Sequence, residues 1–302
     1  MGLKGILTII ISLILISSIF FYFIPLNTLE FISVPENNNF SLFQFDEQMQ
    51  FYPNMRYASN EISYQISNCI LQKENDMTNA FAIVENLTSL KFKSVLNNEE
   101  ISITCQETNR FENDMFVAGE GGATKIIQSK NFNIILQGEI LLIRNSECFK
   151  PNIALHELFH SLGFKHSANP SNLMYNITNC DQTISNDMID QINKLYSTES
   201  NPDLILENVS AIMKGRFLSI NFSVINGGLN KAGESKLLIY AGKSVVKEMD
   251  ILPLEIGQGE IIRLENVFVP QINVKNITLF VETSFLEIDK GNNVINLEIK
   301  ND

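Results

Sequence analysis

The sequence predicts an α+β protein with two folded regions: a mixed α/β region over residues 51–197 and a β-sandwich over residues 204–302. The first region combines strand-like alternation with helical spacing of apolar residues, which is typical of helices packed on a mixed sheet. The second region shows only short β-rich runs separated by turn residues. A polar segment with a proline, residues 198–203, lies between them and predicts a linker.

The α/β region is expected to begin near Tyr52. Apolar and polar residues alternate over residues 61–66, as in a half-buried strand. Apolar residues then recur at three- and four-residue steps from Met77 to Leu87, which predicts a helix with one buried face. Two further strands are expected at residues 90–95 and 101–103.

The second half of this region contains turn signals and one more helix. We expect a glycine-rich turn at residues 119–122, then a strand over 124–128. Strands at residues 133–136 and 139–143 flank Gln137-Gly138, which suggests a hairpin. The last helix is expected to start at Ser185 as its N-cap, with Ile184 and Ile189 as a hydrophobic staple.

The region after the linker lacks helical periodicity. About seven strands in roughly 100 residues are typical of an immunoglobulin-like sandwich. The expected strands cover residues 204–211, 217–224, 236–240, 244–252, 260–269, 277–282 and 294–299.

The N-terminus carries an uncharged apolar run over residues 6–24. This is about the length of a membrane-crossing helix (~20 residues). Lys4 precedes the run and Glu30 follows it, so the N-terminus is expected in the cytoplasm and the body outside the cell. Residues 1–25 are therefore expected to be a transmembrane anchor and residues 26–50 a stalk. A cleaved signal peptide is the alternative, which would give a secreted protein.

The net charge of the chain is −12. This argues against nucleic acid as a partner, because binding phosphates requires clustered Lys and Arg side chains.

The chain has four cysteines, an even number that fits two disulfides in an exported protein. Cys148 and Cys180 closely flank the histidine-rich segment, which favours a Cys148–Cys180 pair and leaves Cys69 with Cys105. Four buried free thiols are the alternative.

All three histidines of the chain fall in one segment, residues 156–166, which reads His-Glu-Leu-Phe-His-Ser-Leu-Gly-Phe-Lys-His. On a helix, His156 and His160 lie one turn apart on the same face and can bind one zinc ion. Gly163 can end that helix and let the chain bring His166 back as a third ligand. Three imidazoles with an open fourth position are typical of a catalytic zinc site, and Glu157 lies beside them.

This segment resembles the zinc signature of the metzincin metallopeptidases. Ser167 and residues 171–175, Ser-Asn-Leu-Met-Tyr, resemble the matrixin branch in particular. The resemblance covers roughly residues 51–197 and implies a mixed five-stranded sheet with three helices. It also implies that Met174 lies in a tight turn below the zinc without binding it, although simple core packing of Met174 would give the same sequence.

The chain departs from many animal matrixins in two respects. Cys69 lies inside the first strand–helix unit, so latency through a prodomain cysteine is not expected. No histidine remains for a second, structural zinc, and a Ca²⁺ site cannot be read from the sequence.

The C-terminal region resembles the CARDB domains of bacterial and archaeal surface proteins. The resemblance rests on residues 202–204, 224–228 and 285–293. An unrelated β-sandwich is the alternative. Other surface proteins and glycans are the candidate ligands of this domain.

The sequence therefore predicts a membrane-anchored, extracellular zinc endopeptidase. His156, His160 and His166 would hold one Zn²⁺, and Glu157 would act as general base toward a zinc-activated water. A protein or peptide substrate would pair with the edge strand of the sheet, which the resemblance places within residues 124–136. The alternative is a surface adhesion or binding protein whose metallopeptidase-like domain is catalytically silent.

Overall fold

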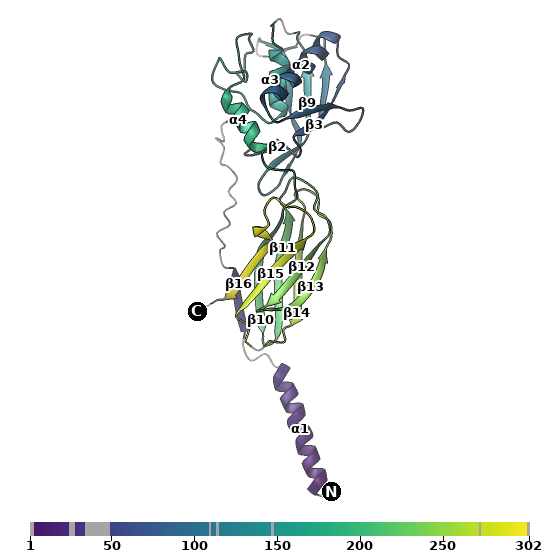
Figure 1. Cartoon of the computed structure of the whole chain (residues 1–302), viewed down its shortest axis with the longest axis vertical. Helices are drawn as coiled ribbons and strands as arrows, with labels where there is room; N and C mark the ends of the chain where they lie inside the picture. Colours follow the sequence, from purple (N-terminus) through teal and green to yellow (C-terminus); the bar gives the residue numbers. More distant parts are fainter. Residues whose placement is uncertain are drawn as a thin grey trace.

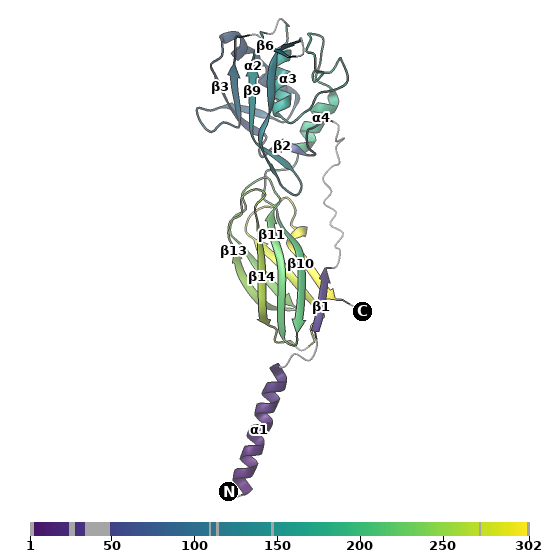
Figure 2. The same ribbon diagram turned by 180° about the vertical axis from the view of Figure 1, so that it is seen from behind.

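The structure is a computed structural model that describes residues 3–23, 28–33, 49–108, 110–112, 115–145, 148–271 and 273–300. Figure 1 shows an α/β domain and a β-sandwich lying end to end, and Figure 2 shows the same arrangement from behind. The expected two-region architecture is thus present.

The N-terminal run forms helix α1 (Leu3–Phe23). Within the described part of the chain, no helix meets the length and apolar character required to cross a membrane. The expected helix is therefore observed, whereas its expected transmembrane role is not confirmed.

The α/β domain is built on one mixed sheet of six strands in the order β2-β9-β5-β3-β4, with β8 paired to β9. Strand β8 is antiparallel to β9, while the other neighbouring pairs are parallel. Within the described residues β8 has β9 as its only partner, so β8 is an edge strand, as expected. The strands are β2 (Met55–Tyr57), β3 (Glu61–Ser67), β4 (Lys91–Ser94), β5 (Ile101–Cys105), β8 (Gly119–Gln128) and β9 (Asn133–Leu142).

The sheet has one strand more than the expected five, because the short segment β2 pairs with Asn133–Ile135 at the start of β9. A separate two-stranded hairpin, β6 (Arg110–Glu112) and β7 (Met115–Val117), leads into β8.

Three helices pack on this sheet: α2 (Leu71–Leu87), α3 (Asn152–Ser161) and α4 (Asn186–Leu195). Met77, Ala80, Phe81 and Val84 of α2 are buried in one core with strand residues such as Ile101, as the helical spacing predicts. Helix α4 begins after Ser185, the expected N-cap residue, although no side-chain capping hydrogen bond forms there.

Two local predictions in this domain were wrong. Residues 119–122 are not a turn but the start of strand β8, and Gln137-Gly138 lies inside the continuous strand β9 rather than between two strands. In both places glycine is explained by packing. A Cβ atom on Gly121 would lie 2.3 Å from the backbone oxygen of Glu157, and one on Gly138 would lie 2.4 Å from the Tyr57 hydroxyl.

The sandwich contains all seven strands expected after the linker. Together with β1 they form the order β13-β12-β15-β16-β1-β10-β11-β14. A short 3₁₀ helix, η1 (Gly291–Asn293), precedes the last strand. The strands are β10 (Leu204–Lys214), β11 (Phe217–Asn226), β12 (Ser235–Ala241), β13 (Ser244–Ile251), β14 (Gly259–Phe268), β15 (Asn276–Thr283) and β16 (Val294–Ile299).

The eighth strand, β1 (Thr28–Ser33), comes from the segment expected to be a stalk. It pairs antiparallel with both β10 and β16, and Phe31 is buried in the sandwich core. The structure therefore differs from the expected stalk at these residues: the α/β domain is inserted between the first and second strands of the sandwich. Residues 34–48 of the expected stalk lie outside the described residues.

Candidate active site

The three histidines converge at the end of helix α3. His156 and His160 lie one turn apart on α3, and both are buried. The helix ends at Ser161, and Gly163 adopts a φ of +94°, which favours glycine and turns the chain back. His166 then reaches the same point, as expected from the spacing.

The three Nε2 atoms lie 3.0–3.2 Å from one another. The other ring nitrogen fixes the tautomer in two of the three rings, because Nδ1 of His156 donates to the Leu173 carbonyl (2.7 Å) and Nδ1 of His160 donates to the Phe164 carbonyl (2.8 Å). The Nε2 atoms of these two rings therefore present lone pairs to each other at 3.0 Å. Two lone pairs repel at this distance, and a cation bound between them would relieve that repulsion.

The donor set fits zinc. Nitrogens bound tetrahedrally at ~2.0–2.1 Å from one zinc ion lie roughly 3.3 Å apart, close to the observed separations. The three side chains are also the one group of potential metal ligands found among the described His, Cys, Asp and Glu residues.

The electrostatic surroundings keep the imidazoles neutral. Burial, and then the neighbouring His156, lower the pKa of His160 to about 4. Burial also lowers the pKa of His156 and of His166. Neutral imidazole is the form that binds a metal ion.

A turn around Met174 supports two of the three rings through its backbone. The Leu173 carbonyl orients His156, and the Met174 carbonyl accepts a hydrogen bond (2.7 Å) from the backbone N–H of Ser167, next to His166. The Met174 side chain is buried in the domain core. Met174 thus lies where the sequence places it, and its surroundings are those of a supporting residue.

Glu157 is buried between helix α3 and the edge strand β8. Gly119 and Gly121 allow this contact, since a Cβ on Gly119 would lie 2.8 Å from Cγ and 2.9 Å from Oε1 of Glu157. Burial, and then the charge of Glu120, raise the pKa of Glu157 to about 8 in the metal-free chain. A nearby cation favours the charged carboxylate and would lower this pKa again.

Two residues near the site were missed in the sequence. Glu120 lies on β8, pairs with Arg110, and acts electrostatically on Glu157. The ring of Phe51 has its centroid 6.1 Å from that of His160 and is half exposed, so it borders the site. Neither residue belongs to a recognisable motif, and only the tertiary structure brings them close.

Both disulfides have the favoured connectivity. Cys148 joins Cys180 and Cys69 joins Cys105. The first closes the segment that carries all three histidines and Met174.

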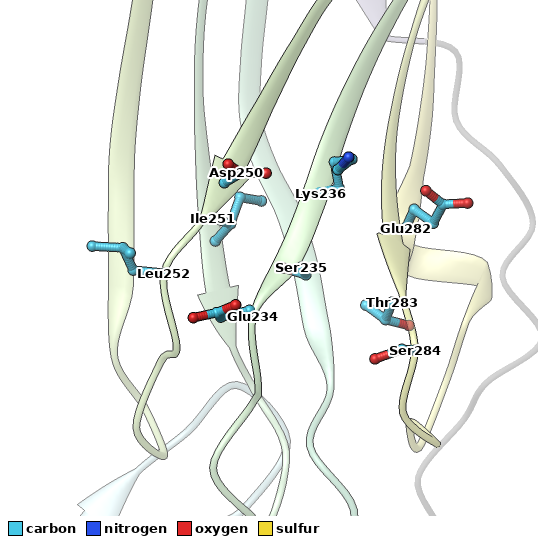
Figure 3. A pocket seen from close by; sticks show the side chains of 9 residues that line it. All are labelled: Glu234, Ser235, Lys236, Asp250, Ile251, Leu252, Glu282, Thr283 and Ser284. Carbon is cyan, nitrogen blue, oxygen red and sulfur yellow. The ribbon is translucent and has the colours of Figure 1, made fainter.

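A separate pocket lies on the sandwich, far in sequence from the histidines. It is lined by side chains of β12, β13 and β15 and their connections, including Glu234, Asp250, Glu282 and Lys236 (Figure 3). These three carboxylates are exposed, and Lys236 pairs with Glu248. The arrangement is that of a solvated surface, and we assign no chemistry to it.

Comparison with known proteins agrees with this geometry. Residues 56–197 match the matrixin peptidase family. This part of the chain is similar to that family, and the α/β domain is called the matrixin domain below for this similarity. A search of curated proteins finds no match.

Three solved structures show a low similarity to parts of this chain. High choriolytic enzyme 1 of the medaka Oryzias latipes, a hatching zinc-protease, is 16% identical over 55% of this chain and 99% of its own, with a TM-score of 0.29. The CARDB domain of a Pyrococcus furiosus protein, solved with di-metal ions, is 17% identical over 33% of this chain and 88% of its own, with a TM-score of 0.28. A solution structure of that CARDB domain is 18% identical over 33% and 94%, with a TM-score of 0.28. These likenesses are too low to carry an argument.

Within the matrixin domain, every residue predicted to act at the site lies at or next to the histidine cluster. Met174 supports the cluster through its backbone, and Gly163 supplies the turn. The matrixin domain therefore combines a potential metal site, a buried carboxylate and an edge strand in one place.

Proposed function

We propose that this chain is a zinc-dependent endopeptidase. The observation that carries the proposal is the convergence of three imidazole Nε2 atoms within 3.2 Å of one another, with Glu157 adjacent in the sequence and buried. The match of residues 56–197 to the matrixin family supports the same class of activity.

In this proposal His156, His160 and His166 hold one zinc ion per chain. A zinc ion bound there would polarise the carbonyl of the scissile peptide bond and lower the pKa of water. The hydrogen bonds from Nδ1 to the Leu173 and Phe164 carbonyls fix the orientation of two ligands, as is usual for histidines that bind metal.

Glu157 is the proposed general base. Its carboxylate would accept a proton from the attacking water and then donate it to the leaving amine. Gly119 leaves room for this carboxylate beside β8, and Gly121 lets the strand approach the backbone of Glu157. Its burial also excludes bulk water, which strengthens its interaction with a nearby cation.

The proposed substrate is an extended peptide segment that adds to the sheet at β8. Within the described residues this strand pairs on one side only, so its other side can offer backbone hydrogen bonds to a peptide. The start of β8 lies against Glu157, which would bring a peptide paired there close to the proposed general base.

The test is digestion of casein by the purified full chain, together with zinc analysis. We expect one zinc per chain, cleavage of casein, loss of cleavage with a chelator, and recovery on adding zinc. A chain that binds zinc and cleaves neither casein nor any member of a peptide library would refute the proposal.

That result would favour a second candidate function, a surface-binding or adhesion protein with a silent peptidase domain. The eight-stranded sandwich favours this alternative, because it is a second folded domain that contributes neither a proposed zinc ligand nor the proposed general base. Proteins and glycans of the cell surface are its proposed ligands.

We also propose that residues 1–25 anchor the chain in a membrane with the body outside the cell. The uncharged run over residues 6–24 and the preceding Lys4 support this. Protease digestion of intact cells is the test: the body should be degraded from outside and a short N-terminal fragment should stay with the membrane. Recovery of the intact chain in the soluble fraction would contradict it.

A further inference from the structure

The tip of the β8–β9 hairpin, residues 129–132, lies against the sandwich. The Ser129 hydroxyl is buried, donates to the Gly227 carbonyl (3.0 Å) and accepts from the backbone N–H of Phe132 (3.2 Å). Lys130 forms an ion pair with Glu207 of strand β10. Polar contacts therefore join the hairpin tip to two different parts of the sandwich.

An apolar cluster fills the same junction. Phe132 and Ile134 from the hairpin are packed with Leu229 from the sandwich, and all three are nearly fully buried. This cluster is separate from the cores of the two domains. Its partly buried members come from both domains and are Ala58, Leu136, Ile256 and Ile288.

A sandwich loop also touches the end of the edge strand itself. Gly257 has a φ of +71°, and a Cβ there would lie 2.8 Å from Cγ2 of Ile127 and 3.3 Å from the carbonyl oxygen of Gln128. Asn226 holds the neighbouring loops together by donating from Nδ2 to the carbonyls of Asn230 (2.8 Å) and Leu254 (3.1 Å). The loop backbone thus lies directly against the last two residues of β8.

Strand β8 is therefore held at both ends by different domains. Its first residues pack on Glu157 through Gly119 and Gly121, and its last residues pack on the sandwich. Between them, the pairing of β8 with β9 shifts register at Ala123–Lys125 and again at Lys125–Ile126. The irregularity is confined to Lys125, because Ile126–Gln128 pair with β9 in the register of the first half, and the end of this C-terminal half also contacts the sandwich.

We propose that the sandwich is a positioning part of the peptidase: it holds the C-terminal half of the edge strand in place for extended substrates. This inference rests on the proposed function, because it assumes that the substrate pairs with β8. Residues 121 and 128 lie roughly 23 Å apart along a strand at ~3.3 Å per residue. Only a long peptide would reach the part of β8 that the sandwich holds.

The experiment compares Leu229→Ala with Leu279→Ala in the full chain. Leu229 lies in the junction, whereas Leu279 is equally buried in the core of the sandwich and belongs to the other cluster. Each variant is assayed, under conditions where it is folded, on a peptide of about ten residues and on one of about four residues with the same scissile bond. Zinc content is measured in each.

Leu229→Ala should lower kcat/KM on the long peptide about tenfold, the worth of about one backbone hydrogen bond, mainly through KM. The short peptide and the zinc content should be unchanged. Leu279→Ala should leave the ratio between the two peptides as in the wild type. The proposal would be overturned if the two variants changed kcat/KM on the long peptide equally. It would also be overturned if Leu229→Ala lowered kcat/KM equally on the long and the short peptide.

Hydrogen exchange gives a second readout that does not require activity. The amides of residues 126–129 should exchange faster in Leu229→Ala than in Leu279→Ala, and unchanged exchange there would overturn the proposal. Unchanged exchange would count against the positioning role of the sandwich alone. An inactive wild type would instead count against the proposed peptidase function. If Leu229→Ala does not fold, Ser129→Ala replaces it, since it removes the hydroxyl bonds to Gly227 and to the Phe132 backbone and leaves the apolar cluster intact.

Discussion

Gly121 offers a direct test of the contact between the edge strand and the helix that carries Glu157. A methyl group at this position would lie 2.3 Å from the backbone oxygen of Glu157 and 2.8 Å from its Cα. Backbone atoms cannot rotate out of the way, so β8 or α3 must move. Overpacking usually costs about 1–3 kcal/mol, and we expect Gly121→Ala to destabilise the matrixin domain by about 3 kcal/mol.

The neighbouring Gly122 supplies the matched control. No heavy atom lies within 4 Å of a Cβ built there, and its φ is outside the left-handed region. Gly122→Ala should therefore be neutral or stabilise the chain by up to about 1 kcal/mol, since alanine restricts the unfolded state. Urea unfolding, monitored by far-UV circular dichroism, measures the free energy of unfolding of both variants. Equal free energies of unfolding for the two variants would refute this account of the strand–helix contact.

Three further predictions follow from particular contacts. Gly119→Ala should keep zinc but lower peptide hydrolysis up to about 100-fold, because its Cβ would displace the Glu157 carboxylate rather than the ligands; loss of zinc would contradict this. Burial raises the pKa of Asp203 from 3.8 to about 6, so this group costs the folded state stability as pH rises from about 4 to 6 and none below pH 4. Asp203→Asn should therefore gain roughly 2–3 kcal/mol relative to the wild type between pH 4 and pH 7, and a difference independent of pH in denaturant titrations would count against it. Replacing Cys148 and Cys180 by Ser should cost roughly 4 kcal/mol, since their disulfide closes a loop with a sequence separation of 32; reduced thermal stability checks this, and an unchanged Tm would be the contrary result.

Features specified by short-range patterns could be predicted from the sequence. The spacing of His156, His160 and His166 with Gly163 brings three ligands to one point, because helix geometry and one turn largely determine it. The seven sandwich strands after the linker were likewise predicted by alternation and turn residues.

Features specified by distant contacts were missed. Strand β1 pairs with β10 and β16, so only a tertiary contact makes a strand of what reads as a stalk, although Leu29 and Phe31 do point into the same core. The glycines at 119–122 and Gly138 were interpreted as turns from their local propensity. Gly119 and Gly121 instead admit Glu157, and Gly138 admits Tyr57; both admitted residues are remote in sequence.

Arg56 illustrates the same limit at the domain junction. It is buried, donates to the carbonyls of Thr198 (3.2 Å) and Ala58 (3.2 Å), and lies 4.2 Å from the ring centroid of Tyr196. Burial lowers the pKa of Arg56. A single arginine near the start of a domain carries no sequence signal for this role, since its partners are backbone carbonyls, one of Ala58 close to it in the chain and one of Thr198 at the start of the linker.

The central claim is that Glu157 acts on water beside a zinc ion held by three histidines. The most direct measurement is zinc content and peptide hydrolysis of Glu157→Ala beside the wild type. We predict one zinc per chain in both proteins and hydrolysis in the wild type alone, because Glu157 is not one of the ligands. Continued turnover of peptide by Glu157→Ala with its zinc bound would contradict the account.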